Sequence, residues 1–408
     1  MTRTNKFRAD HSLYFETLES RLPFSASPLS AGTEFAASAA KGGVKLPYTY
    51  SLTGNTADVA VNLPLASSGL ALVGGGTDVD AVFNWMGSRA GGGDFLVLRA
   101  TGTDAYNTYI DRLVPSLDSV ATLIIPDRAT AMNSDVAAII NRAEAIFLAG
   151  GDQSNYVNFW NDTPVETAIY QAVLRHASIG GTSAGLAVLG DIDFSASLDT
   201  ITSAEALSNP LDPRIVSSLD SRFLSPNDSS VAGSSTVLRY MDNVITDSHF
   251  MQRDRMGRLL TFMADNDAAN IVDGQPLGIG VNEQTALLIN YDGVTQVVGN
   301  AYTNRKLTAT EEQRSAYILR GNTVNPSVSA GVPLVYSASV ARANYDPEAL
   351  SGPLGDVFDL DDLFGSTSWN VPGLDTYDVF AANSQATLFD LSDLIYGEML
   401  AKRRAKLA

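Results

Sequence analysis

Short apolar segments alternate with amphipathic segments through the first half of the chain. Amphipathic stretches with helical spacing cover residues 80–90, 107–117 and 134–145. They separate five apolar segments, each of which stops at Gly, Pro or Asp: 70–76, 95–102, 121–127, 145–152 and 178–183. Continuous apolar strands that alternate with helices are typical of a parallel sheet covered on both faces. The pattern therefore predicts an α/β fold of three layers, with a mostly parallel sheet flanked by helices.

The pattern changes after residue 190. Pro210, Pro213 and Pro226 interrupt residues 191–235, which we expect to form loops and short helices. The elements predicted after this segment are a strand at 243–250, a helix at 253–266, and two strands within 277–299 that turn at Tyr291–Gly293.

Composition divides the chain into three parts. Residues 1–66 are rich in Ser, Ala, Gly and Thr, and we interpret them as a leader and linker. Residues 67–345 form the main predicted domain. Residues 346–408 are an acidic, Gly/Pro-rich extension whose end is predicted to be a helix, with acidic residues first and basic residues last. The acidic run 356–364 lacks the Gly and the closing Glu of an EF-hand loop, so we interpret it as a solvated surface segment without metal.

The first residues indicate export. Arg3, Lys6 and Arg8 precede a segment that lacks the continuous apolar core of an ordinary signal peptide. This segment resembles an "LE-x-R-x-L-L-S-A" signature of exported bacterial proteins at Leu18, Glu19, Arg21, Ser25 and Ala26. Pro23 and Phe24 stand where that signature has leucines. No apolar run approaches the ~18 residues that a membrane span needs, so we expect an exported protein without a span.

Charge and composition exclude several classes of function. The chain has 27 Lys and Arg residues against 45 Asp and Glu, and its net charge of -18 repels nucleic acid and anionic membrane surfaces. It has no cysteine, which excludes disulfides, thiolate metal sites and a cysteine nucleophile.

The segment "GTSAG", residues 181–185, matches the G-x-S-x-G nucleophile elbow and lies directly between a buried strand and a helix. Glycines at these positions let the chain turn sharply, and the backbone N–H groups that follow point toward a developing oxyanion. Ser183 is therefore the candidate nucleophile, and the Ala184 N–H is one candidate oxyanion donor. The alternative is a Gly-rich turn in which the serine has no chemical role.

A serine nucleophile needs a neighbouring base, and the chain has three histidines. His11 lies in the leader, and His176 lies in the last turn of a predicted helix, on the far side of the strand that precedes the elbow. By elimination the base is His249.

A third group must fix the tautomer of the imidazole of His249. Glu283 qualifies because apolar sequence flanks its carboxylate, which has little reason to be buried without a partner. Asp247 also qualifies because it precedes His249 by two residues, which places both side chains on one face of a strand. The residues alone leave this choice open.

Four segments resemble signature blocks of the S51 serine peptidases, above all of the cyanophycinases and more distantly of the aspartyl dipeptidases. They are "AGGDQSN" (149–155), "GGTSAGLAVLG" (180–190), "DSHFMQRDRMGRLL" (247–260) and "GIGVNEQTAL" (278–287). The resemblance covers about residues 70–299 and implies a flavodoxin-like or class I glutamine-amidotransferase-like α/β fold without cofactor or metal. It implies Glu283 as the third member of the triad, and Gly75 or Gly76 as the second oxyanion donor.

The resemblance also implies a substrate pocket lined by Gln153, Asp247, Arg253, Arg255 and Arg258. Guanidinium groups can bind a carboxylate in bidentate fashion, as a β-linked aspartyl substrate requires, although at least one arginine is expected on a solvated helix face. Two positions depart from the family pattern. Ser248 replaces the glutamine of the usual "DQHF", and Asp254 replaces the glycine of the usual "R-G-R". Both departures affect substrate recognition and leave the triad intact.

These features predict a serine-type peptidase that hydrolyses a β-aspartyl or cyanophycin-like peptide, such as one containing β-Asp-Arg, through an acyl-enzyme on Ser183. Two alternatives remain at this point: a non-catalytic exported binding protein on a peptidase fold, and an esterase or amidase with the same triad. A peptide is the expected partner, nucleic acid is not, and a homodimer is compatible with the sequence.

Overall fold

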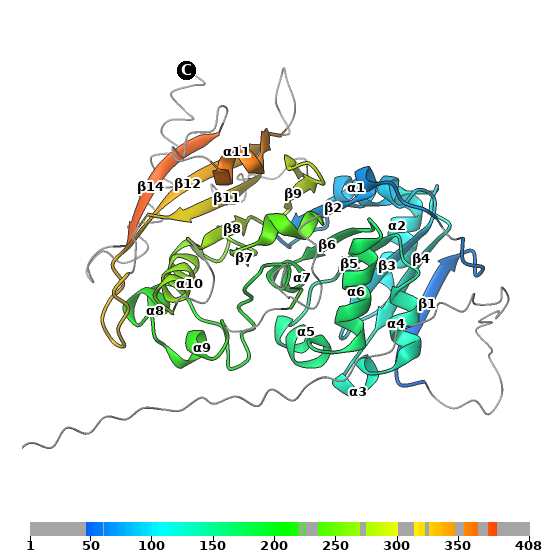
Figure 1. Cartoon of the computed structure of the whole chain (residues 1–408), viewed down its shortest axis with the longest axis horizontal. Helices are drawn as coiled ribbons and strands as arrows, with labels where there is room; N and C mark the ends of the chain where they lie inside the picture. The colour runs from blue at the N-terminus through cyan, green and yellow to red at the C-terminus, as the bar shows by residue number, and fades with distance from the viewer. Residues whose placement is uncertain are drawn as a thin grey trace, which may run out of the picture. The chain divides into compact units, whose positions relative to one another are not determined.

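A computed structural model describes the chain over residues 46–59, 61–219, 223–224, 236–269, 275–300, 314–322, 326–346, 355–365 and 374–381. All of these residues lie in one compact unit, Ala39–Ala408, and they form two sheets with helices packed against them (Figure 1). The predicted export signature, His11 and the predicted C-terminal helix lie outside the described residues.

The larger sheet confirms the strands predicted from the apolar segments. Its strand order over the described residues is β1-β4-β3-β5-β6-β2-β9-β10-β13, and the strands from β4 to β2 pair in parallel. The parallel strands are β2 (Gly69–Val73), β3 (Asp94–Arg99), β4 (Ser119–Ile124), β5 (Ala145–Leu148) and β6 (Ser178–Thr182). All five coincide with the predicted apolar segments.

Helices cover both faces of this sheet, as the three-layer prediction requires (Figure 1). Successive strand residues point to opposite faces: in β3, Leu96 and Leu98 join one hydrophobic core and Val97 joins another. The first core includes side chains of α4 (Ser134–Ile140), α5 (Gln153–Trp160) and α6 (Pro164–Leu174). The second includes side chains of α1 (Asp80–Arg89) and α2 (Ala105–Leu113). The strands are continuously apolar because each is buried on both sides.

Antiparallel strands extend the larger sheet beyond the domain predicted at 67–345. On one side β1 (Thr49–Gly54) pairs with β4, although it lies within the predicted linker. On the other side β9 (Thr285–Asn290), β10 (Val294–Gly299) and β13 (Val357–Asp359) follow β2, and β13 lies within the predicted extension.

The second sheet has the order β14-β12-β11-β8-β7 over the described residues. Its strands are β7 (Val244–Asp247), β8 (Leu277–Val281), β11 (Arg314–Gly321), β12 (Tyr336–Tyr345) and β14 (Asp375–Ala381). The helix α10 (Met256–Ala269) packs against this sheet in a separate hydrophobic core. The short helices α8 (Ser203–Ser208) and α9 (Pro213–Val216) fall in the segment predicted to contain loops and short helices.

The prediction of one strand between residue 277 and the turn at Tyr291–Gly293 is wrong. β8 ends at Val281 in the second sheet, β9 begins at Thr285 in the larger sheet, and residues 282–284 carry the chain from one sheet to the other. Both strands are buried and apolar, so the sequence pattern contains no sign of the change of sheet.

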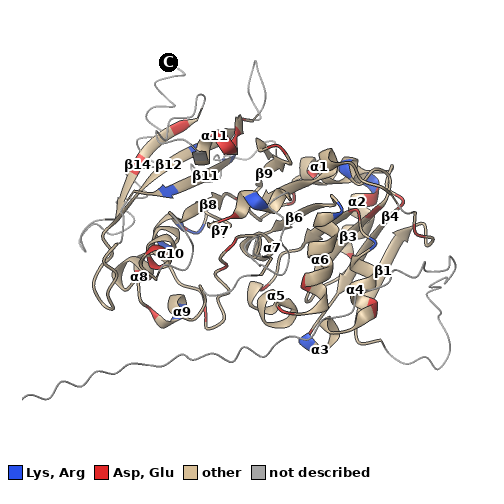
Figure 2. Ribbon diagram, in the orientation of Figure 1, with Lys and Arg blue, Asp and Glu red and all other residues tan. Residues whose placement is uncertain are grey.

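The acidic run 356–364 is also more than a solvated surface segment. It forms β13 and the helix α11 (Leu360–Gly365), in which Leu360 and Leu363 are fully buried while Asp361 and Asp362 are exposed. Other acidic residues are spread over many elements of the described chain (Figure 2).

Candidate active site

Ser183 lies at a sharp turn between β6 and the short helix α7 (Ala184–Ala187), as the elbow motif predicts. Its backbone has φ 55 and ψ -112, a conformation that a non-glycine residue rarely adopts. A Cβ atom at Gly181 would lie 2.4 Å from the carbonyl oxygen of Gly185, and one at Gly185 would lie 2.0 Å from that of Leu148. The two glycines of the motif are therefore required by the packing of the turn.

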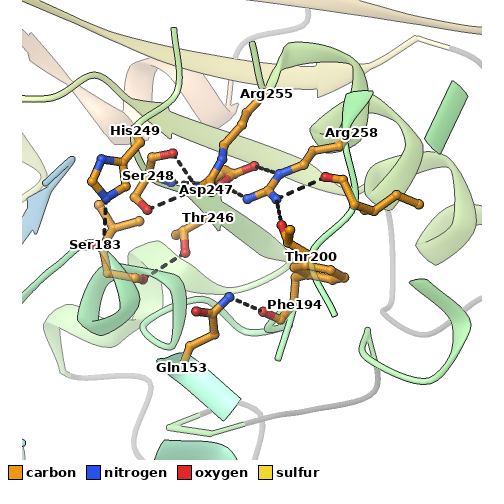
Figure 3. Close-up of polar contacts among 12 residues, drawn as sticks. Gln153, Ser183, Phe194, Thr200, Thr246, Asp247, Ser248, His249, Arg255 and Arg258 are labelled. Carbon is orange, nitrogen blue, oxygen red and sulfur yellow. Dashed lines mark hydrogen bonds and ion pairs between the residues drawn. The ribbon is translucent and has the colours of Figure 1, made fainter. Parts of the chain in front are cut away.

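Three side chains from distant parts of the chain form one series of hydrogen bonds. The Oγ of Ser183 lies 2.7 Å from Nε2 of His249 (Figure 3), and Nδ1 of His249 lies 2.6 Å from Oε1 of Glu283. The Glu283 carboxylate accepts the proton on Nδ1, which leaves Nε2 free to accept the serine proton. This is the geometry of a nucleophile, a base and an orienting acid.

The two competing residues do not contact this series. Asp247 ends β7, and its carboxylate instead binds Arg258 and Arg255. The spacing argument for Asp247 fails because the strand stops there and His249 follows in a turn with φ 46. His176 lies beyond the end of α6, where its Nδ1 is 3.0 Å from the carbonyl oxygen of Leu63.

The glycines after β2 hold both parts of the triad in place. The carbonyl of Gly74 accepts the N–H of His249 at 2.7 Å, and the carbonyl of Gly75 accepts the N–H of Gln284 at 2.8 Å. Gly75 has φ 95, and a Cβ atom built on it would lie 2.5 Å from Cε1 of His249. A Cβ atom on Gly76 would lie 3.0 Å from Cβ of Glu283. The chain passes so close to the imidazole that only glycine fits at residue 75.

Gly75→Ala is expected to lower kcat/KM by about a hundredfold, because the new methyl group displaces the imidazole and strains the backbone. Steady-state kinetics with a hydrolysed peptide measures the loss. Gly92→Ala is the matched control, since it also has positive φ but its Cβ atom would meet only one neighbour, at 3.5 Å. Equal activity of Gly75→Ala and Gly92→Ala would contradict the close packing of Gly75 on His249.

Burial is the main cause of the lowered pKa of His249. The hydrogen bond that His249 donates to Glu283 raises the pKa again in part, while the positive charges of Arg253 and Arg255 lower it. His249 is therefore neutral at neutral pH, as a general base must be.

The pKa of His249 sets the expected pH profile. Only the neutral imidazole accepts the serine proton, so kcat/KM should fall as pH decreases through this pKa, with its midpoint below the ordinary value of 6.5. The measurement is kcat/KM against pH in buffers of constant ionic strength. A midpoint above neutrality would contradict the depressed pKa.

The carboxylate of Asp247 is held by two arginines. Arg258 binds it through Nε and Nη2 at 2.7 and 2.6 Å, and Nη1 of Arg255 lies 3.1 Å from it (Figure 3). Asp247 is 2% exposed and Arg258 is 4% exposed. Although burial by itself raises the pKa of Asp247, the two guanidinium groups outweigh it and the pKa is lowered. Burial lowers the pKa of Arg255 to about 10.

A pocket opens beside Ser183 and His249. The residues implied by the family resemblance all line it: Gln153, Asp247, Arg253, Arg255 and Arg258. Ala184 also lines it, and as the first residue of α7 its N–H has no acceptor within the helix. Sequence reasoning missed Phe194 and Thr246, which lie in the pocket wall. Phe194 comes from the proline-interrupted segment, in which no periodicity marks a buried side chain.

The three arginines differ in what they bind. Arg258 and Arg255 are paired with Asp247, whereas Arg253 is exposed and has no ion pair within the described part of the chain. Arg253 lies in the turn before α10, not on a solvated helix face as expected for one of the three. The backbone carbonyl of Ser248, the residue that departs from the family pattern, accepts a hydrogen bond from Arg255 at 2.8 Å.

Among the residues that the structure describes, no group of three or more His, Asp or Glu side chains is arranged to hold a metal ion. No helix in the described ranges has the length and apolar character to cross a membrane.

The known proteins to which this chain is similar are peptidases of one family. Residues 99–212 match the sequence model of peptidase family S51. A cyanophycinase of Synechococcus elongatus is 30% identical over 213 residues, which are 49% of this chain and 56% of that protein. One from Geminocystis herdmanii is 28% identical over 249 residues, which are 57% and 80% of the two chains. A solved peptidase structure from an acI-B1 Actinobacterium has 18% identity and a TM-score of 0.37, and covers 57% of this chain and 88% of its own.

The chain spans about half the length of the Synechococcus relative. The family match includes the end of β3, all of β4, β5 and β6, and the elbow, so it contains Ser183. This chain is therefore similar to peptidase family S51 over residues 99–212, and to cyanophycinases over about half of its length.

Proposed function

We propose that this chain is a serine peptidase that cleaves a β-aspartyl or cyanophycin-like peptide through an acyl-enzyme on Ser183. The observation that carries the proposal is the hydrogen-bonded series Ser183–His249–Glu283, with distances of 2.7 and 2.6 Å. It is supported by the cyanophycinases to which the chain is similar.

The proposed reaction follows from the positions of these groups. Nε2 of His249 takes the proton from Oγ of Ser183, and Oγ attacks the carbonyl carbon of the scissile bond. The backbone N–H groups of Ala184 and Gly75 would stabilise the oxyanion. His249 then gives its proton to the leaving amine, and water, activated by the same imidazole, hydrolyses the acyl-enzyme.

The charge of the pocket supports a substrate that carries a carboxylate. Three arginines line it against one aspartate, Asp247, so positive charge is in excess beside Ser183. Arg253 is the arginine best placed to bind substrate, because the described residues leave its guanidinium without an ion pair.

The test is hydrolysis of cyanophycin, β-Asp-Arg peptides and α-Asp peptides side by side, with products identified by mass. Cleavage of the first two is expected. Preferential cleavage of p-nitrophenyl esters would instead identify an esterase. A chain that hydrolyses none of these substrates and is not labelled by a covalent serine probe would be a non-catalytic binding protein.

We also propose that the protein is exported, which the resemblance at residues 18–26 supports. Fractionation of cells that express the full chain tests this, since retention in the cytoplasm would contradict it.

A further inference from the structure

The imidazole and the carboxylate of the triad lie on two separate turns. His249 lies on the turn between β7 and α10, and Glu283 lies where the chain crosses from β8 to β9. Both turns include residues with positive φ, namely His249 at 46° and Gln284 at 57°. Such conformations cost about 1–3 kcal/mol each and persist only where the surrounding structure holds them.

Two side-chain amides join these turns reciprocally. Oε1 of Gln252, on the histidine turn, accepts the backbone N–H of Glu283 at 3.0 Å. Oδ1 of Asn282, on the acid turn, accepts the backbone N–H of Met251 at 3.0 Å. Each turn therefore supplies one side-chain acceptor to a backbone N–H of the other.

Backbone bonds also hold the two turns, but they are made by other residues of these turns and of β8, not by Glu283. His249 and Gln284 are each bonded to the segment after β2, through Gly74 and Gly75 respectively. Phe250 donates to the carbonyl of Val281 at 3.1 Å, which joins the turns at the end of β8, before the crossing. The bond to Gln252 is made by Glu283 itself.

The exposure of Glu283 makes this restraint important. Its side chain is 29% exposed, whereas that of His249 is 9% exposed, so water competes for the carboxylate and not for most of the imidazole. Asn282, by contrast, is fully buried, and its amide therefore has a fixed environment. A partly exposed carboxylate keeps a hydrogen bond to its partner only where the backbone of its own residue is held in position.

We propose that Gln252 and Asn282 are positioning residues that hold Glu283 against His249 by tying the two turns together. This inference rests on the proposed function, because it assigns these amides a role in the proton transfer from Ser183.

Loss of the two amide hydrogen bonds is expected to change the pKa of His249 in one direction. The charged groups that act on His249 are Glu283, which raises its pKa, and Arg253 and Arg255, which lower it. If these amide hydrogen bonds are removed, the carboxylate of Glu283 is hydrogen-bonded to Nδ1 of His249 for less of the time. It then raises the pKa of His249 by less. The pKa of His249 then falls further, and the serine becomes less reactive.

The first variant is Gln252→Ala, with Gln171→Ala as its control, because Gln171 is an exposed glutamine on α6. Two readouts need no known substrate: the rate at which phenylmethanesulfonyl fluoride labels Ser183, and the titration of His249 by proton NMR. The chain has three histidines, so the imidazole spectrum is simple to assign.

For Gln252→Ala we expect labelling at least about tenfold slower and a His249 pKa lower by about half to one unit. Gln171→Ala should match the wild type in both. Gln252→Glu keeps the acceptor oxygen and adds negative charge, so it should restore labelling and bring the pKa to the wild-type value or above. Asn282→Ala should change both readouts in the direction of Gln252→Ala.

A merely structural role predicts a different result. Gln252→Ala would then lower the melting temperature without moving the pKa of His249, and that outcome overturns the inference. Failure of Gln252→Glu to restore the labelling rate overturns it as well. If the wild type itself is not labelled, the proposed function fails instead, so the two failures are distinguishable.

Discussion

Ser183→Ala is expected to lower kcat by about 10⁴- to 10⁶-fold on any peptide that the wild type hydrolyses. The variant lacks the Oγ atom that His249 deprotonates in the proposed reaction. The elbow should still fold, because its shape depends on Gly181 and Gly185 and alanine keeps the same backbone. Single-turnover and steady-state assays measure the loss, and circular dichroism checks the fold.

Ser116→Ala is the matched control, since Ser116 is exposed and lies in the loop between α2 and β4. It should retain wild-type activity. A Ser183→Ala protein that still cleaves the peptide at a comparable rate would remove the serine from the mechanism.

Asp247→Ala is expected to destabilise the protein by about 3–5 kcal/mol. The substitution leaves the guanidinium of Arg258 buried without the carboxylate that it binds through two hydrogen bonds. Arg255 loses one of its partners at the same time. Urea denaturation followed by circular dichroism gives the change in the free energy of unfolding.

Asp104→Ala provides the comparison, because Asp104 is exposed and makes no capping hydrogen bond to α2. It should change the unfolding free energy by no more than about 0.5 kcal/mol. A loss below about 1 kcal/mol for Asp247→Ala would mean that Arg258 gains water when its partner is removed.

The parallel half of the fold could be predicted from the sequence because each of its strands is buried on both faces. Continuous apolar segments that end at Gly, Pro or Asp marked all five strands. The elbow was recognisable because its motif needs glycines at fixed positions around Ser183. In the structure, a side chain at Gly181 or Gly185 would clash with the backbone. His249 followed by elimination, because the chain offers few histidines.

The position of the acid could not be worked out from the residues alone. Apolar flanking sequence favoured Glu283, whereas the two-residue spacing from His249 along a strand favoured Asp247, and neither argument outweighed the other. The structure distinguishes them through two events that leave no periodic signal. β7 stops before His249, and the chain changes sheet at residues 282–284.

The two edge strands of the larger sheet could not be predicted from the sequence either. β1 and β13 are short strands in segments whose composition resembles linker or surface, and each becomes a strand by pairing with a neighbour. Pairing between distant segments depends on tertiary structure, which local composition does not encode.

The passage of the chain from β8 to β9 makes the hydrogen bond between Glu283 and His249 depend on how the two sheets pack together. Glu283 lies where the chain leaves one sheet for the other, so a shift of one sheet relative to the other would change the alignment of carboxylate and imidazole before any secondary structure melts. Substitutions in the core around α10, at residues that do not line the pocket, should therefore slow catalysis while the protein is still folded.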